Sequence, residues 1–212
     1  MIQSIASWFN AGGTYMWIIL ALCAIAVAVA ADRLIYYYFF CGTDSSRLLH
    51  RAVTALSGNN PEDRFAFLKK GRSPLVILLR TAVERYEAGA PIEQIEEGIE
   101  EASIKELPKI TNRLNYLSLF ANIATLVGLL GTIAGLQQSF ASLATAEAAQ
   151  KAAMLAAGIA KAMNTTAFGL IVAVPCMAAF TFLHNKQQSL INDIDDAVVR
   201  VVNTMKTARA AV

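Results

Sequence analysis

Charged residues are absent from three long stretches of this 212-residue chain. No Asp, Glu, Lys or Arg occurs in 15–31, 114–146 or 162–183, and only 16% of all residues are charged while 56% are hydrophobic. Ordinary soluble domains are about a quarter charged, and a helix that spans a bilayer needs about 20 mostly apolar residues. The missing charge argues against an ordinary soluble domain and predicts an all-α membrane protein with three transmembrane helices.

Residues for metal binding or catalysis are also scarce. The three cysteines are odd in number and lack metal-ligand spacing, and the two histidines stand apart from them. We therefore expect buried thiols, no metal site and no cofactor. No nucleotide-binding loop, nucleophile–base pair or pair of catalytic carboxylates is present, so we expect no enzyme activity. The net charge of +2 gives no indication of nucleic-acid binding, and none is expected.

Basic residues are unevenly distributed along the chain. Residues 1–17 contain none, whereas 41–113 contain eleven. Positive charge marks the cytoplasmic side of short loops, so we expect a periplasmic N-terminus and a cytoplasmic C-terminus. The first 32 residues also lack the basic region of a cleavable signal peptide, so the first span is expected to be retained. Arg33, followed by three tyrosines, is expected to anchor that span by snorkelling to the inner interface.

These patterns divide the chain into seven parts, with long helices extending from the membrane into a cytoplasmic helical region. The predicted parts are an N-terminal periplasmic or interfacial helix (1–14), a first transmembrane helix (15–40), a cytoplasmic helical domain (41–113), a second transmembrane helix (114–146), a periplasmic turn (147–153), a third transmembrane helix (154–184) and a cytoplasmic C-terminal helix (185–212).

Helical spacing and turn signals order the 41–113 segment. We expect helices over 46–56, from Pro61, over 73–89 and from Pro91, the last running on into the second span with a kink at Pro108. Its acidic face is either a solvated surface or a docking surface for a cytoplasmic partner. That face carries Glu93, Glu96, Glu97, Glu100 and Glu101.

Two threonines stand at matching places in the second and third spans. Thr132 lies 17 residues before Ala149, the centre of the expected turn, and Thr166 lies 17 residues after it. At 1.5 Å per residue, both lie about 25 Å from the tip of the hairpin and hence at one depth. Thr165 adds a neighbouring hydroxyl. These hydroxyls either bond the carbonyl four residues earlier in their own helix, or line a polar path or bind an inserted partner.

Glycines give the same two helices smooth faces. Small residues at spacings of three and four allow helix backbones to approach closely, within one subunit and between copies. The glycines expected to serve this packing are Gly128, Gly131, Gly135, Gly158 and Gly169.

Acidic residues are almost absent from the hairpin. Between Leu114 and Asn192 the only one is Glu147, at the expected outer turn. Ion paths through membranes normally use titratable groups at depth. Either this chain carries no ions, or a partner subunit supplies the carboxylate.

The segments LVGLLGTIAGLQQSF (126–140) and GIAKAMNTTAFGLIVAVPCM (158–177) resemble the MotA/TolQ/ExbB proton-channel family. Three spans and a cytoplasmic segment after the first resemble its ExbB and TolQ branch. The resemblance implies a bacterial inner-membrane motor subunit in which five copies surround two copies of a single-span ExbD/TolR-type partner. The partner's membrane aspartate takes up protons, the pore threonines (here Thr132 and Thr166) face it, and proton flow drives work on the cell envelope.

Lys161 stands where the family usually has glutamate. It is either a snorkelling or ion-paired lysine, with Glu147 as the candidate partner, or part of an altered outer ion route. Two other functions stay open for the chain as a whole. One is a structural scaffold without ion flow, and the other is a sodium-driven version of the motor.

Overall fold

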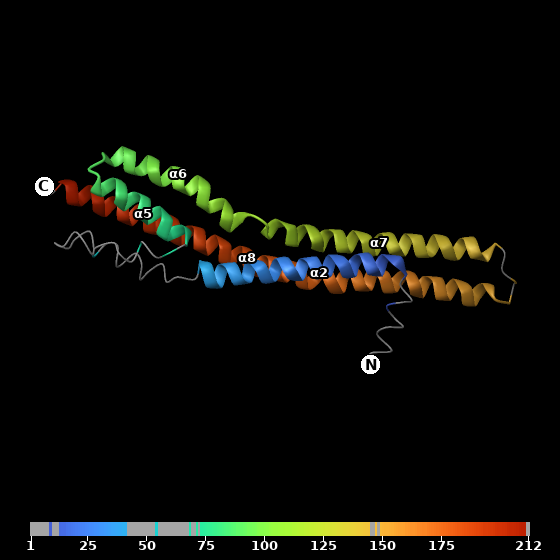
Figure 1. Cartoon of the computed structure of the whole chain (residues 1–212). Coiled ribbons are helices and arrows are strands. Elements are labelled where there is room, and N and C mark those ends of the chain that lie inside the picture. The colour runs from blue at the N-terminus through green and yellow to red at the C-terminus, as the bar shows by residue number, and fades with distance from the viewer. Residues whose placement is uncertain are drawn as a thin grey trace. The chain divides into compact units, whose positions relative to one another are not determined.

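The computed structural model describes residues 9, 13–41, 54, 68, 71, 73–144, 147 and 149–210. The expected helices over 46–56 and from Pro61, and nearly all of 1–14, lie outside these residues. Within the described residues every regular element is a helix (Figure 1). The elements are α2 (Thr14–Ile35), the π-helix η1 (Tyr36–Phe40), α5 (Pro74–Glu87), α6 (Ile92–Thr111), α7 (Leu114–Leu143) and α8 (Lys151–Ala210).

Three segments are long and apolar enough to cross a membrane, judged by length and composition: Thr14–Phe39, Ile92–Leu143 and Lys151–Arg209. This confirms the prediction of an all-helical chain with three candidate spans. The chain forms two compact units, one of Met1–Asp32 with Arg113–Phe182 and the other of Arg33–Asn112 with Leu183–Val212. Each unit is described by itself below.

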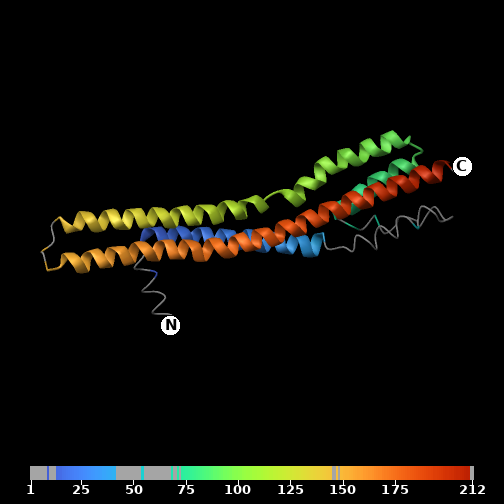
Figure 2. The same ribbon diagram turned by 180° about the vertical axis from the view of Figure 1, so that it is seen from behind.

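In the first unit, α2, α7 and the first half of α8 lie side by side, as both views show (Figures 1 and 2). The buried positions of α7 are three or four residues apart, the spacing of helices packed nearly parallel or antiparallel. From Ala121 onward these positions hold small residues, so the helix backbones approach closely. The buried residues of α7 are Leu114, Leu117, Ala121, Ala124, Gly128, Gly131, Gly135 and Ser139.

In the second unit, α5 and α6 form an antiparallel pair joined by a tight turn at Gly89, whose φ of 75° ends α5. The Ser73 hydroxyl accepts a hydrogen bond from the Val76 amide and caps the start of α5, with Pro74 in its first turn. The Arg85 side chain covers Gly98 and pairs with Glu101 at 3.7 Å. The predicted helices over 73–89 and from Pro91 are therefore confirmed.

The second half of α8 completes this unit. Its buried stripe includes Leu190, Ile194 and Ala197. Lys206 pairs with Glu96 of α6 at 2.6 Å, and the Arg209 guanidinium lies 5.4 Å from the Tyr86 ring centre. Part of the acidic face of α6 is thus neutralised within the unit, while its remaining members are exposed: Glu93, Glu97 and Glu100.

The expected kink at Pro108 is instead a break three residues later. α6 continues through Pro108 and ends at Thr111, Asn112 is extended with ψ 152°, and Arg113 takes the left-handed conformation with φ 72°. Proline removes one backbone hydrogen bond but does not by itself end a helix. The break arises where the backbone leaves the helical region at Asn112 and Arg113.

Arg33 does not snorkel, contrary to expectation. Its side chain is buried and donates hydrogen bonds to the carbonyl oxygens of Lys109 (3.2 Å) and Asn112 (3.4 Å). The Tyr37 hydroxyl, also buried, lies 2.9 Å from the Ile110 carbonyl oxygen, to which it donates. The last carbonyls of a helix have no partner within the helix, so these two side chains cap the end of α6.

The predicted third span (154–184) and C-terminal helix (185–212) lie on one long helix. α8 runs unbroken from Lys151 to Ala210, through Pro175. The buried three–four spacing continues from one part to the other through Leu183, Gln187 and Leu190, so packing favours one helix. The three cysteines are free thiols. Cys41 and Cys176 are buried as expected, whereas Cys23 is half-buried, and burial raises the pKa of the Cys41 thiol.

Candidate functional site: a threonine pair between two helices

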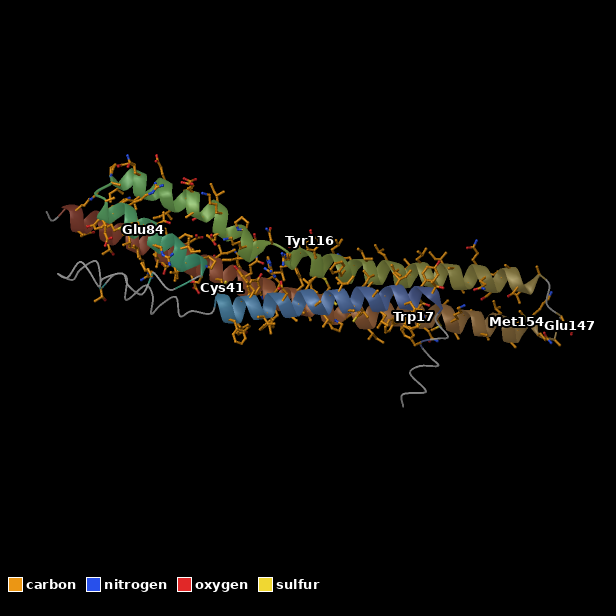
Figure 3. All side chains as sticks on the ribbon, viewed as in Figure 1. Trp17, Cys41, Glu84, Tyr116, Glu147 and Met154 are labelled. Carbon is orange, nitrogen blue, oxygen red and sulfur yellow. The ribbon has the colours of Figure 1, made fainter. Side chains whose placement is uncertain are left out.

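Thr132 of α7 and Thr166 of α8 face each other, with their hydroxyl oxygens in contact. Their equal distance along the chain from the turn predicts this meeting, because antiparallel helices bring such positions to one level. Figure 3 shows Glu147 at the turn that joins the two helices, with Met154 nearby on α8. Both threonines are half-buried in the single chain, so their hydroxyls stay within reach of solvent or of another molecule.

The hydroxyls share backbone acceptors in a crossed pattern. Thr132 Oγ1 lies 3.3 Å from the carbonyl oxygen of Gly128 in its own helix and 3.3 Å from that of Ala162 in α8. Thr166 Oγ1 donates to the same Gly128 oxygen at 3.0 Å. Each threonine thus reaches a carbonyl four residues before the other threonine.

This pattern bears on the two readings of the hydroxyls. The own-helix bond expected of an ordinary membrane threonine is available to Thr132, and a cross-helix bond is available as well. A hydroxyl has one proton, so it donates to one acceptor at a time. Thr132 can therefore change its acceptor without moving either helix.

Thr165 has a different environment from its neighbour. It is only 1% exposed, and its hydroxyl donates to the Lys161 carbonyl oxygen at 3.1 Å in its own helix. Its methyl group fills the space above Gly131, where an added Cβ would clash with it. In the single chain Thr165 is packed between the helices, and its hydroxyl makes the bond to the carbonyl four residues earlier that was the first of the two alternatives.

The expected glycine faces meet each other within this chain. A Cβ at Gly128 would lie 3.3 Å from the Thr165 carbonyl oxygen and from the Thr166 Cα, and one at Gly169 would lie 2.8 Å from the Ala124 carbonyl oxygen. A Cβ at Gly135 would lie 3.1 Å from that of Ala162. The Gly169 separation leaves no room for a Cβ, and the other two are tighter than ordinary contacts, so the glycines allow the close approach at which the threonines meet.

Lys161 and Glu147 are not brought together. Among the residues that the structure describes, no ion pair joins them, and Glu147 is exposed. Lys161 is ten residues into α8, about 15 Å along it, which exceeds the reach of its side chain to the turn. A Cβ at Gly13, just before α2, would instead lie 3.3 Å from Lys161 Cε and 3.6 Å from its Nζ.

Two residues of the site were missed by the sequence reasoning. The Ser139 hydroxyl donates to the Gly135 carbonyl oxygen at 2.7 Å and occupies the space above Gly158. Ser139 lies ten residues before Ala149 and Gly158 nine after it, so the hairpin arithmetic that pairs the threonines would have found it. Tyr15 of α2 lies against Gly131, and no sequence signal pointed to that contact.

These features define a class: a multi-span helical membrane protein with a close-packed, glycine-faced hairpin that carries a hydroxyl pair and no acidic group at its depth. Comparison with known proteins identifies the group within that class. Residues 70–196 match the model of the MotA/TolQ/ExbB proton channel family, and the chain belongs to this family. The match covers both threonines, all of α7 and α8 as far as residue 196.

Individual relatives agree with this assignment. The chain is 30% identical over 157 residues to the Tol-Pal system protein TolQ of Pseudomonas aeruginosa, covering 72% of this chain and 64% of that protein. It is 29% identical over 188 residues to a putative biopolymer transport protein, ExbB-like 3, of Synechocystis, with 86% and 88% covered. It is 27% identical over 174 residues to biopolymer transport protein exbB1 of Vibrio cholerae, with 81% and 75% covered. The chain thus matches less than two thirds of that TolQ.

Proposed function

We propose that this chain is the channel-forming subunit of a proton-driven motor of ExbB/TolQ type in the bacterial inner membrane. It would convert proton motive force into mechanical work on the cell envelope, in energised transport, envelope maintenance or gliding. The observation that carries the proposal is the half-buried Thr132–Thr166 pair within a hairpin that matches a proton-channel family.

The missing carboxylate argues for a second protein in the path. The hairpin supplies hydroxyls, and its single acidic residue, Glu147, is exposed at the turn. A proton path through a membrane needs a titratable group at depth. We propose that a single-span ExbD/TolR-type subunit supplies a membrane aspartate, with two copies of it inside a ring of five copies of this chain.

The crossed hydrogen bonds suit the pair to such a partner. When Thr132 donates its proton to an incoming carboxylate, Thr166 still has the Gly128 carbonyl oxygen as its acceptor at 3.0 Å. The pair can therefore switch between bonding within the chain and bonding to a carboxylate without leaving a hydroxyl unpaired, which would be costly away from water.

The contacts of α2 support a placement of the bilayer. Its 22 residues span about 33 Å, close to the roughly 30 Å of a hydrocarbon core. At one end Tyr15 lies against Gly131, and at the other Asp32 pairs with Arg113 at 3.9 Å. On this placement Thr132 lies near the periplasmic boundary, and the remainder of α7 projects beyond it. The N-terminus is periplasmic, and residues 41–113 and 185–212 are cytoplasmic.

A double variant tests the role of the hydroxyls. We expect Thr132→Ala with Thr166→Ala to abolish partner-dependent proton flux in reconstituted vesicles, while subunit assembly on native gels is unchanged. The corresponding double serine variant, which keeps both hydroxyls, should retain flux. Thr207→Ala is the control, because the Thr207 hydroxyl bonds only the Asn203 carbonyl oxygen in its own helix. Full flux in the double alanine variant would refute the role of the pair.

One observation favours a second candidate, a structural scaffold without ion flow. Both hydroxyls find acceptors inside the chain, and the glycine faces close on each other. A scaffold predicts no flux in the same vesicles with or without the partner, and loss of assembly on bulky substitution of Gly131. A sodium-driven motor predicts flux that disappears when sodium is replaced while the proton gradient is held.

A further inference from the structure

A row of amide and hydroxyl side chains follows one flank of α7 from its start toward the threonine pair. The steps of three, four and three residues between its members are those of one helix face. Leu129 takes the next position of that spacing, and Thr132 the one after it. We call the following four residues the polar row: Asn115, Ser118, Asn122 and Thr125.

The polar row is not covered by the described helices. Asn115, Asn122 and Thr125 are exposed, and Ser118 is half-buried with its hydroxyl 3.8 Å from the Met177 sulfur of α8. Thr125 donates to the Ala121 carbonyl oxygen at 3.1 Å. Within the described part of the chain, neither asparagine amide has a hydrogen-bond partner. These amides therefore need partners from outside the described part of the chain.

Asn122 lies at the middle of the membrane placement given above. It is nine residues from Arg113, which pairs with Asp32, and nine from Gly131, which meets Tyr15. Each distance is about 13 Å along the helix. An amide that faces lipid tails at that depth has no partner and is strongly disfavoured.

The periodicity of the helix also determines the side of α7 on which Asn122 lies. Nine residues at 3.6 per turn make two and a half turns, so Asn122 is on the opposite side of α7 from Gly131 and the contact with α2. Residues further round the exposed surface are apolar, as lipid contact requires, for example Leu119 at 47% and Leu130 at 51% exposed. The polar row is therefore turned away from α2 and flanked by lipid-type surface.

We propose that the polar row lines a water-filled path that continues from the threonine pair toward the start of α7, with Asn122 holding water at mid-depth. The proposal rests on the proposed function and extends it by about 15 Å, the ten residues from Thr132 to Asn122. An amide donates and accepts hydrogen bonds but does not titrate, so it orders water without retaining a proton. One apolar residue, Leu129, lies between this path and the threonine pair.

Thiol labelling tests whether the row is wet. Asn122→Cys and Leu119→Cys are made in the full-length chain with Cys23, Cys41 and Cys176 replaced by serine, and are labelled in membranes with a charged methanethiosulfonate. The cysteine thiolate attacks the sulfur of this reagent and displaces its methanesulfinate, and a thiolate forms only where water reaches the thiol. We therefore expect Cys at position 122 to react about tenfold faster or more than Cys at position 119. N-ethylmaleimide, which enters lipid, should label both. Thr125→Cys gives a second position should Asn122→Cys not assemble.

Equal, slow labelling of positions 122 and 119 would overturn the proposal. Oxidative cross-linking of Cys at position 122 to another copy, without labelling, would also overturn it by showing that the row is a subunit interface. Labelling needs no proton transport, so its outcome is separate from that of the flux assay. Rapid labelling in a chain that conducts no protons would support the wet row while refuting the proposed function.

Discussion

At the scale of single residues, the site depends on which positions have no side chain. The Thr165 methyl occupies the space that a Cβ at Gly131 would need, and Thr165 is adjacent to the Thr166 hydroxyl that meets Thr132. A close-packed contact contains no empty space for added atoms. The hydroxyl pair is therefore held in place by a neighbouring contact between one methyl group and one glycine.

This contact predicts that a second substitution will offset part of the destabilisation caused by the first. Gly131→Ala should destabilise the protein by about 1–3 kcal/mol, because the new Cβ clashes with the Thr165 methyl. Thr165→Ser removes that methyl and keeps the hydroxyl that bonds the Lys161 carbonyl oxygen, so the double variant should regain part of the loss. Unfolding in mixed micelles with increasing denaturing detergent measures both. Strictly additive effects would show that the two positions do not clash.

At the scale of elements, the end of α6 is the place where the chain departs most from an ordinary helix. Arg33 and Tyr37 supply hydrogen bonds to three carbonyl oxygens there, those of Lys109, Ile110 and Asn112. The left-handed Arg113 follows at once. The break is therefore a capped helix end rather than a flexible kink, and its position depends on side chains from far along the chain.

Adjacent tyrosines provide a matched test of this cap. Tyr37→Phe should lower the unfolding free energy by about 1 kcal/mol, because the Ile110 carbonyl oxygen loses a buried donor. Tyr38→Phe should change it little, since Tyr38 is 52% exposed. Thermal unfolding in detergent, followed by circular dichroism, compares the two variants. Equal effects would mean that the hydroxyl of Tyr37 does not cap α6.

At the scale of the whole molecule, orientation in the membrane is the property on which the proposed motor depends. The prediction comes from the eleven basic residues in 41–113 and the absence of any in 1–17. Two exposed glutamates suit a test, Glu147 at the hairpin turn and Glu84 on α5, both marked in Figure 3. Neither makes an ion pair among the described residues, so a cysteine at either position should be tolerated.

In cells whose outer membrane has been made permeable, an impermeant maleimide should label Glu147→Cys directly. Glu84→Cys should react only after the inner membrane is disrupted. The native cysteines are replaced by serine in both variants, and a cytoplasmic enzyme assayed in the medium reports on leakage. The reverse pattern would place the hairpin tip in the cytoplasm and contradict the proposed orientation of the chain in the membrane.

The sequence alone determined the three apolar helices, the glycine faces and the meeting of Thr132 with Thr166. These follow from local quantities, namely charge-free length, helical spacing and equal distance from one turn, and each is fixed by the regular geometry of a helix. For Thr165 and Lys161 the sequence left alternatives open. The packing of the single chain gives Thr165 a hydrogen bond within its own helix, and the length of α8 keeps Lys161 away from Glu147 at the turn.

Only the tertiary structure decided how the chain's irregular features are used. Arg33 was expected at a lipid interface, yet it is buried and caps a helix 76 residues away in sequence. The break fell at Asn112 and Arg113 instead of Pro108. The physical reason is common to these cases: a buried polar group takes whatever partner the packing brings to it. Partners distant in the chain leave no periodic signal in one sequence.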